Sequence, residues 1–422
     1  MSEQACPQCG AAIPVNEGFL TWCHVCGWNV SAPPVAHEAT GRLARLYDRV
    51  GRKLGDRLAD QVVEADASRR ASSPARIGAY AVATAVHLLS LGLLVGGVAL
   101  AVLTSFNPFL LVISVIAVGT AILMRPRLGT VPKEGVLEGA DAPALHGFVD
   151  EVAAALGTRS IDVLVVDDEY NASWQIVGIR RRRVLTLGLP LQTALDPPER
   201  VALVAHELAH GRNGDSTRGL FVGSSIRGLA ELYDVLAPPE MSAAAWREVD
   251  TFDRVVSIFL WIVSRPVLGV LFLQVWLATR DAQRAEYMAD ALAADVAGTP
   301  GAVSLQEKVL LASTFLHVVQ RAAHEKDLDA DIFDRLAQAV RTVPAREVER
   351  RRHVARLEGV RLTDHHPPTG HRIHVLERRP GRAPRVTLDP ATSATIDREV
   401  EGRRQTLQHK LLDDYRDSLY YG

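Results

Sequence analysis

The longest apolar runs of the chain lie near its first quarter. Residues 77–103 contain no charged side chain, and after the short connection "TSFNP" a second apolar run covers residues 109–124. A helix needs about twenty apolar residues to cross a bilayer, so the first run is more than long enough and the second is just adequate. The pattern therefore predicts a transmembrane helical hairpin over residues 76–124.

Charges beside this hairpin predict its orientation. The connection between the two runs is uncharged, whereas basic residues flank the pair at both ends: Arg69, Arg70, Arg76, Arg125, Arg127 and Lys133. Because Lys and Arg favour the cytoplasmic side, both ends of the hairpin are expected in the cytoplasm. His87 lies within the first run, where a neutral histidine in a helix interface is favoured over a functional ionisable group.

Residues 31–75 combine a linker with an amphipathic pattern. The stretch "SAPPVAHEATG" has the composition of a linker. Between residues 43 and 58, apolar side chains recur at helical spacing with arginines on the opposite face. A helix lying on an anionic membrane surface and a helix packed on a protein partner fit this pattern equally well.

Beyond Lys133 the pattern is that of a globular domain with helices and a few strands. "APALHGFVDEVAAALG" has helical spacing, "IDVLVVDD" is typical of a strand, and "WQIVGIRRRRVLTLGLPL" predicts two β segments around a basic stretch. The fold class predicted for residues 125–422 is mostly α with a small β-sheet. Arg180–Arg183 could touch lipid head groups, but a charge run is more often a solvated turn or edge.

Overall composition excludes one class of partner. The net charge of -2 and the pI near 6.7 give no overall attraction to nucleic acid. The apolar fraction of 48% is partly concentrated in a few blocks, which is typical of a membrane protein with soluble parts.

All the cysteines lie within the first 26 residues. They form two C-x2-C pairs separated by thirteen residues: Cys6, Cys9, Cys23 and Cys26. This spacing favours a zinc ribbon over disulfides or free thiols, and no signal peptide precedes it, which favours a reducing cytosol. A ribbon over residues 1–30 is too small to fold on hydrophobic burial alone, so its Zn²⁺ is expected to be structural.

The stretch "VALVAHELAHGRNGDS" carries the clearest chemistry. It begins after two prolines and a glutamate and reaches Gly211, which predicts a helix that ends at this glycine. His206 and His210 are four apart on one helix face and can present both imidazoles to one metal ion. Glu207 is placed to act as the general base for water that this metal activates.

A catalytic zinc needs a third protein ligand, and residues 279–294 supply a candidate. Glu286 and Asp290 share one helix face among small residues. Glu286 would be the ligand, and Asp290 would accept a hydrogen bond that orients a ligand histidine. A solvent-facing acidic pair is the alternative, which the upstream motif disfavours.

This metal site constrains residues 255–278, an apolar stretch long enough to span a bilayer. His206 and Glu286 flank it and must meet at one ion, and about twenty-four residues cannot cross twice. Arg265 and Pro266 interrupt its middle. The block 219–237 could provide a second crossing, but its charges argue against one: Arg227, Glu231 and Asp234. We therefore interpret 255–278 as a buried or interfacial helix.

Three blocks together carry a family resemblance. In order, over roughly residues 130–380, "HELAHGRNGDS", "RDAQRAEYMADALA" and "DHHPPTGHRI" resemble the signature blocks of the HtpX-like and CAAX-prenyl-protease zinc metallopeptidases, a gluzincin family. The resemblance implies a zincin-like α+β domain. It also implies one Zn²⁺ held by His206, His210 and Glu286, with Glu207 as the general base and Asp290 as the aspartate one turn after the glutamate ligand.

The same resemblance implies substrate contacts. His366 matches the histidine of the family's H-P-P block and Arg372 the arginine after it, both expected to bind or polarise the substrate carbonyl. "YNASW" resembles the strand that pairs with bound peptide, which makes Asn171 and Ala172 candidate substrate-binding residues. The chain departs from the family at His371, where a glutamate commonly precedes the arginine. The ribbon lies outside the family pattern and suggests a regulatory or partner-binding addition.

Together these patterns predict a membrane-anchored zinc endopeptidase with one catalytic and one structural Zn²⁺. Its expected partners are protein or peptide substrates and membrane lipid, with the ribbon and the peptidase domain on the cytoplasmic side of the cell membrane. The main alternative is a non-catalytic adaptor that binds client proteins, which the complete set of catalytic residues disfavours. A prenyl-protein processing protease would need a chamber of many spans, so quality control of membrane or misfolded proteins is favoured.

Overall fold

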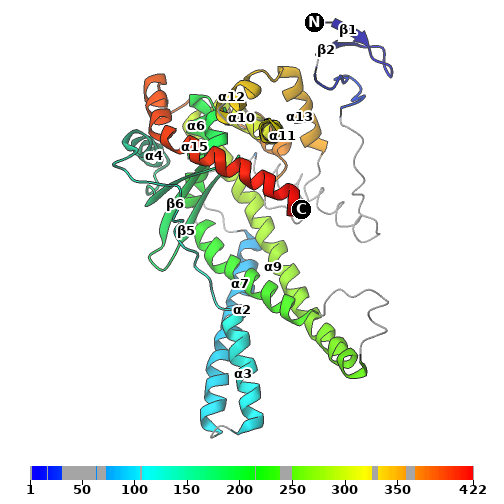
Figure 1. The fold of residues 1–422 in the computed structure, drawn as a ribbon, viewed down its shortest axis with the longest axis vertical. Coiled ribbons are helices and arrows are strands. Elements are labelled where there is room, and N and C mark those ends of the chain that lie inside the picture. Colours follow the sequence, from blue (N-terminus) through cyan, green and yellow to red (C-terminus); the bar gives the residue numbers. More distant parts are fainter. Residues whose placement is uncertain are drawn as a thin grey trace.

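The computed structural model describes residues 2–16, 18–30, 63, 73–104, 107–213, 215–237, 250–325, 331–357 and 366–421. The described chain is mostly helical with two small sheets, which confirms the predicted fold class (Figure 1). The predicted amphipathic helix over residues 43–58 lies outside the described residues.

A small cysteine-containing unit begins the chain. Strands β1 (Ser2–Ala5) and β2 (Ala12–Val15) pair antiparallel. This unit rests on helix α13 (Ala345–Leu357) through a buried Trp22. The Arg346 guanidinium donates to the Trp22 carbonyl at 2.8 Å and lies 5.2 Å from the centre of the Trp22 ring. The unit is therefore docked on the domain through specific contacts.

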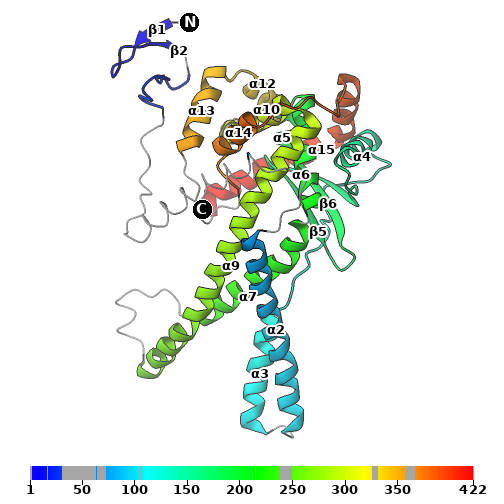
Figure 2. The ribbon, with the colours of Figure 1, turned by 180° about the vertical axis from the view of Figure 1, so that it is seen from behind.

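Helices α2 (Pro74–Leu103) and α3 (Pro108–Leu123) form an antiparallel pair that extends away from the rest of the molecule (Figures 1 and 2). Asn107 caps α3 by accepting from the backbone N–H groups of Phe109 and Leu110. The two helices approach closely at Gly97, where an added Cβ would lie 2.9 Å from the Val118 side chain. By length and composition α2 can cross a membrane, whereas α3 is a shorter apolar helix of 16 residues.

Helix α9 (Thr251–Ala297) corrects one prediction. Its apolar segment is long enough to span a membrane and only 6% buried, so the buried half of the interpretation of 255–278 is wrong, and an interfacial helix stays a prediction. Large side chains such as Phe259 and Phe272 are exposed. Arg265, which seemed to exclude a lipid environment, lies 4.5 Å over the Trp261 ring, a contact that lowers the cost of its charge.

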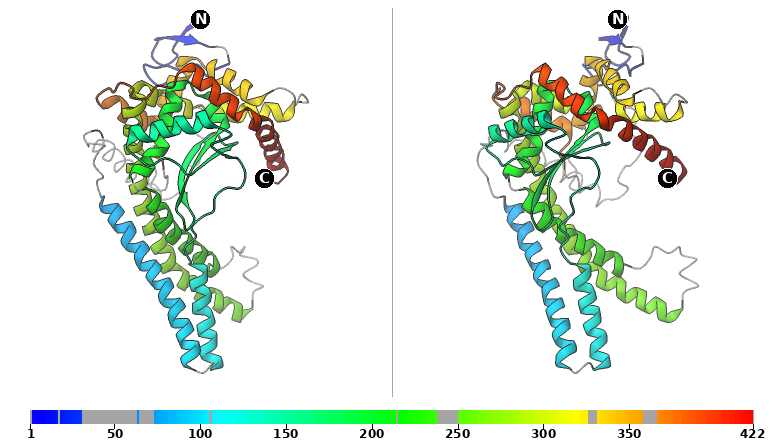
Figure 3. Two further views of the ribbon diagram at one scale, coloured as in Figure 1. Left: turned by 90° about the vertical axis from the view of Figure 1, so that its left-hand side faces the viewer. Right: turned by 60° about the vertical axis from the view of Figure 1, so that its left-hand side comes forward.

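Helix α7 (Asp215–Leu236) runs beside α9, so two neighbouring helices lie in the chain between His210 and Glu286. Buried residues of α2, α7 and α9 pack together near Val222 and Ala278. Figure 3 shows α7 and α9 descending together along the side of α2. The chain can therefore leave the region of His210 along α7 and return to Glu286 along α9, which one helix alone could not do.

The globular domain after α3 is built on a four-stranded sheet. Its strands are β3 (Val136–Leu137), β4 (Val163–Asp167), β5 (Ala172–Val177) and β6 (Arg182–Gly188), in the order β3-β4-β6-β5. Strands β4 and β6 are parallel and the other pairs antiparallel. Helices α4 (Pro143–Leu156) and α6 (Pro197–Asn213) share the main hydrophobic core with this sheet. Strand β5 is thus left at the sheet edge.

The remaining helices surround this core. They are α5 (Leu189–Ala194), α10 (Thr299–Val309), α11 (Ala312–His324), α12 (Ile332–Arg341), α14 (Thr369–Arg378) and α15 (Pro390–Tyr421). Helix α10 packs against α6, α9 and α14, which brings three sequence blocks far apart in the chain to one place.

Candidate active site

Helix α6 presents the two motif histidines side by side. Glu199 at its third position accepts from the backbone N–H of Asp196 at 2.8 Å, so the first turn is capped as in a capping box. The His206 and His210 rings have centroids 5.0 Å apart and planes at 88°. Both imidazoles therefore face the same region from successive turns.

The predicted end of this helix was wrong by two residues. Helix α6 continues through Gly211 to Asn213, so Gly211 is not the C-cap. A Cβ at this position would lie 2.8 Å from the Trp174 ring of β5. The glycine is needed because the edge strand passes close to the helix.

Glu286 completes the cluster from α9. Its Oε2 lies 3.5 Å from His206 Nε2 and its Oε1 3.5 Å from His210 Nε2. Nitrogen and oxygen ligands at about 2.0–2.2 Å from a tetrahedral zinc stand about 3.3–3.6 Å apart. Within the described chain, the buried Oε2 accepts no hydrogen bond. The donor set, its spacing and this orphaned oxygen all fit a single divalent cation.

Asp290, one turn after Glu286, is contacted from three sides, by His206, Gln306 and Arg372. His206 Nδ1 lies 3.0 Å from its Oδ1, which leaves Nε2 directed toward Glu286. Burial lowers the pKa of His206, but its contacts with the Asp290 and Glu286 carboxylates raise it to about 10.

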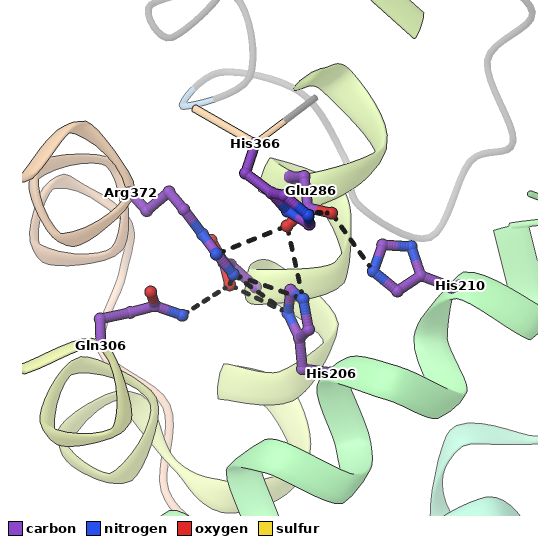
Figure 4. Close-up of polar contacts among 7 residues, drawn as sticks. His206, His210, Glu286, Gln306, His366 and Arg372 are labelled. Carbon is purple, nitrogen blue, oxygen red and sulfur yellow. Dashed lines mark hydrogen bonds and ion pairs between the residues drawn. The ribbon is translucent and has the colours of Figure 1, made fainter. Parts of the chain in front are cut away.

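Gln306 is a member of the cluster that the sequence did not predict. It lies on α10, is buried, and donates from Nε2 to Asp290 Oδ1 at 3.2 Å (Figure 4). No motif surrounds it, since "SLQEK" is an ordinary helical stretch. The packing of α10 against α9 is the signal that identifies it, and this signal exists only in three dimensions.

Arg372 of α14 lies on the buried side of the cluster. It donates to Asp290 from Nε at 2.8 Å and from Nη2 at 2.6 Å, and its Nη1 lies 3.5 Å from Glu286 Oε2. Burial lowers the pKa of Arg372, but the two carboxylates more than offset this and raise it, so the guanidinium stays charged. In this arrangement Arg372 holds Asp290 and balances the charge of Glu286.

His366 lies on the opposite, open side. Its side chain is exposed, and its Nδ1 lies 3.1 Å from Glu286 Oε1. This contact raises the pKa of His366. The two residues expected to bind the substrate carbonyl thus occupy different places, His366 at the opening and Arg372 behind the carboxylates (Figure 4).

A cleft of about 670 Å³ leads to these groups. Glu207 lines it beside His206 and His210, and all of β5 forms one wall. Asn171 and Ala172 also line the cleft at the start of β5, where Asn171 accepts from the Gly188 backbone N–H at 2.9 Å. Among the described strands, β5 has a hydrogen-bonded neighbour on one side only. Its other edge is therefore available to a ligand in the cleft.

The four cysteines of the N-terminal unit also converge. Cys6 and Cys26 have sulfurs 3.7 Å apart, and those of Cys9 and Cys23 are 3.6 Å apart. Four thiolates at about 2.3 Å from a tetrahedral zinc have sulfurs about 3.8 Å apart. All four sulfurs lie within 4.8 Å of one another, which fits one metal ion.

Comparisons with known proteins agree with the geometry. Residues 140–380 match the model of a family described as "Peptidase family M48". Two curated proteins described as "Protease HtpX homolog", from Bacteroides fragilis strains YCH46 and ATCC 25285, are similar to the chain. Each is 22% identical over 242 residues, which cover 57% of this chain and 70% of the relative.

Proposed function

Because the chain belongs to peptidase family M48, as an HtpX-like metallopeptidase, we propose that it is a membrane-anchored, zinc-dependent endopeptidase. The observation that carries this proposal is the convergence of His206, His210 and Glu286 at one point of a cleft with an edge strand. The family supports a protease that acts on peptides or proteins. The metal and the roles of the residues are our inference.

Each side chain has a distinct task in this proposal. Zinc held by the three ligands would supply a Lewis acid that polarises water and the scissile carbonyl. Glu207 takes the proton of the attacking water and passes it to the leaving amine. His366, on the open side, donates to the carbonyl oxygen as negative charge develops there. Asp290, held by Arg372 and Gln306, fixes the orientation of His206.

Substrate binding follows from the edge strand. An extended peptide that adds to the free edge of β5 would lie along the cleft wall, with Asn171 and Ala172 next to the catalytic groups. Recognition through main-chain hydrogen bonds is tolerant of sequence. This tolerance supports a role in the quality control of membrane or misfolded proteins.

The ribbon completes the metal content. We propose that Cys6, Cys9, Cys23 and Cys26 hold a second, structural Zn²⁺. The docking of Trp22 on α13 then depends on a metal-folded ribbon, because so small a unit has little core of its own.

Metal removal tests the proposal. The full-length protein should cleave an unfolded protein substrate, stop after its zinc is removed with a chelator, and recover when Zn²⁺ is added back. Peptide fragments separated by mass spectrometry provide the readout. Cleavage that continues unchanged in the metal-free protein would show that the chemistry does not depend on this cluster.

Orientation is a separate prediction. With basic residues at both ends of the α2–α3 pair, a reporter inserted near Asn107 should be accessible from outside the cytoplasm and a reporter at the C-terminus only from inside. Impermeant labelling of intact cells measures both. A C-terminal reporter labelled from outside would overturn the cytoplasmic placement of the peptidase domain.

A further inference from the structure

The turn between β5 and β6 carries an unusual combination of side chains. Ile179, at its apex, is 88% exposed, and Arg180, Arg181 and Arg182 follow it, all exposed. Gly178 and Arg181 both have positive φ, and the Arg181 backbone N–H donates to the Gly178 carbonyl at 3.1 Å. The turn is therefore tight and holds the Ile179 side chain outward, next to the three arginines.

The same turn is attached to the segment that leaves helix α3. The Gly178 backbone N–H donates to the Leu128 carbonyl at 2.8 Å, and Gly129 packs against Val177. One residue earlier, Arg127 forms an ion pair with Glu231 of α7 at 2.6 Å. The end of α3, helix α7 and the turn are thus fixed to one another at one level of the molecule.

That level coincides with the boundary expected for a membrane around α2 and α3. The 16 residues of α3 rise about 24 Å, slightly less than the ~30 Å hydrocarbon thickness of a bilayer. With the connection at Asn107 on the far side, the residues directly after α3 lie at the near boundary. Figures 1 and 3 show the β5–β6 hairpin pointing toward the end of the molecule from which α2 and α3 extend.

We propose that the turn Gly178–Arg182 is a membrane-contacting loop that binds anionic lipid. Ile179 enters the boundary between head groups and acyl chains, and the three arginines bind lipid phosphates. Arginine suits this role because its five donors match phosphate geometry. Arg182 also donates from Nη2 to the Asp162 carbonyl at 3.3 Å, and Arg183, which forms an ion pair with the Asp162 carboxylate at 2.7 Å, is left out of the lipid contact. An ordinary solvated turn would explain the arginines but not an isoleucine that is 88% exposed directly before them.

This contact, together with the proposed function, identifies a substrate class. Strand β5 runs about 20 Å from the turn to Ala172, and Trp174, four residues before Gly178, lies against Gly211 beside the ligand His210. A peptide paired with β5 would begin at the lipid surface and reach the catalytic groups about four residues later. The inferred substrates are therefore segments of membrane proteins that directly follow a transmembrane span.

Lipid contact can be measured without catalysis. A fluorescent amino acid is placed at residue 179 of the full chain in nanodiscs that carry head-group spin-labelled lipid. The matched control has it at Leu316, an exposed apolar residue of α11. Figure 1 shows α11 at the end of the molecule opposite the α2–α3 pair. We expect strong quenching at 179, more with phosphatidylglycerol than with phosphatidylcholine alone, and little at 316. Equal quenching at both positions would overturn the lipid contact.

Substrate class needs a second comparison. Replacing Arg180, Arg181 and Arg182 by Glu should leave cleavage of a soluble peptide unchanged and slow cleavage of the same sequence next to a membrane anchor several-fold. Equal slowing, or no slowing, of both substrates would overturn the inferred substrate class. If the wild-type chain cleaves neither the soluble nor the anchored peptide, the proposed peptidase function is refuted instead. The quenching result would still test the lipid contact.

Discussion

The variant Glu207→Gln should keep its zinc, fold normally and still bind substrate, yet lose hydrolysis by about 10²–10⁴-fold. Glutamine preserves the size and much of the hydrogen bonding of Glu207, but it cannot take a proton from the attacking water. Glu207 is buried and lines the cleft beside both histidines. No other carboxylate of α6 lines this cleft. Turnover of a protein substrate and zinc content, measured on the same preparation, separate the two properties.

A matched variant controls for the amide itself. Glu151→Gln makes the same chemical change on the exposed face of α4, away from the residues that line the cleft, and should turn over at the wild-type rate. If Glu207→Gln cleaves as fast as Glu151→Gln, the "HELAH" helix does not carry the chemistry.

Glu286→Ala should have the second large effect, of a different kind. It removes a metal ligand, so zinc content and activity should fall together, from about two zinc ions per chain to the one held by the ribbon. It also removes one of the two buried carboxylates that lie beside Arg372 and His206, which should lower the unfolding temperature.

Asp290→Asn is the informative comparison for this loss. It keeps all three ligands but weakens the contacts of Asp290 with His206 and Arg372, so affinity or activity should fall by about 10–100-fold. Elemental analysis and thermal unfolding measure the series. Two zinc ions retained by Glu286→Ala would exclude Glu286 as a ligand.

The site could be predicted from sequence to the extent that its parts are local. Two histidines four apart share a helix face whatever the fold, and Glu286 and Asp290 repeat this relation on a second helix. The sequence does not give the distance between these two helices. It requires only that they lie close together if both supply ligands to one metal ion. The edge strand was similarly visible as a short β segment before a basic turn.

Long-range packing accounts for what the sequence missed. Gln306 belongs to the cluster only because α10 crosses α9 at Asp290. The exposed apolar face of α9 was obscured by Arg265, whose contact with Trp261 is invisible in a hydropathy pattern. The docking of Trp22 on α13 joins residues more than three hundred positions apart in the chain, a distance over which no periodicity carries information.

The most direct test of the catalytic metal centre is a zinc measurement on the chain without residues 1–30. All four cysteines lie within the first 26 residues, so this form contains no cysteine, and any tightly bound zinc must use other ligands. We predict one zinc ion per chain, bound by nitrogen and oxygen at about 2.0–2.2 Å in its X-ray absorption spectrum. We also predict that His210→Ala in the same form removes this zinc. A shortened chain that binds no zinc would contradict the account.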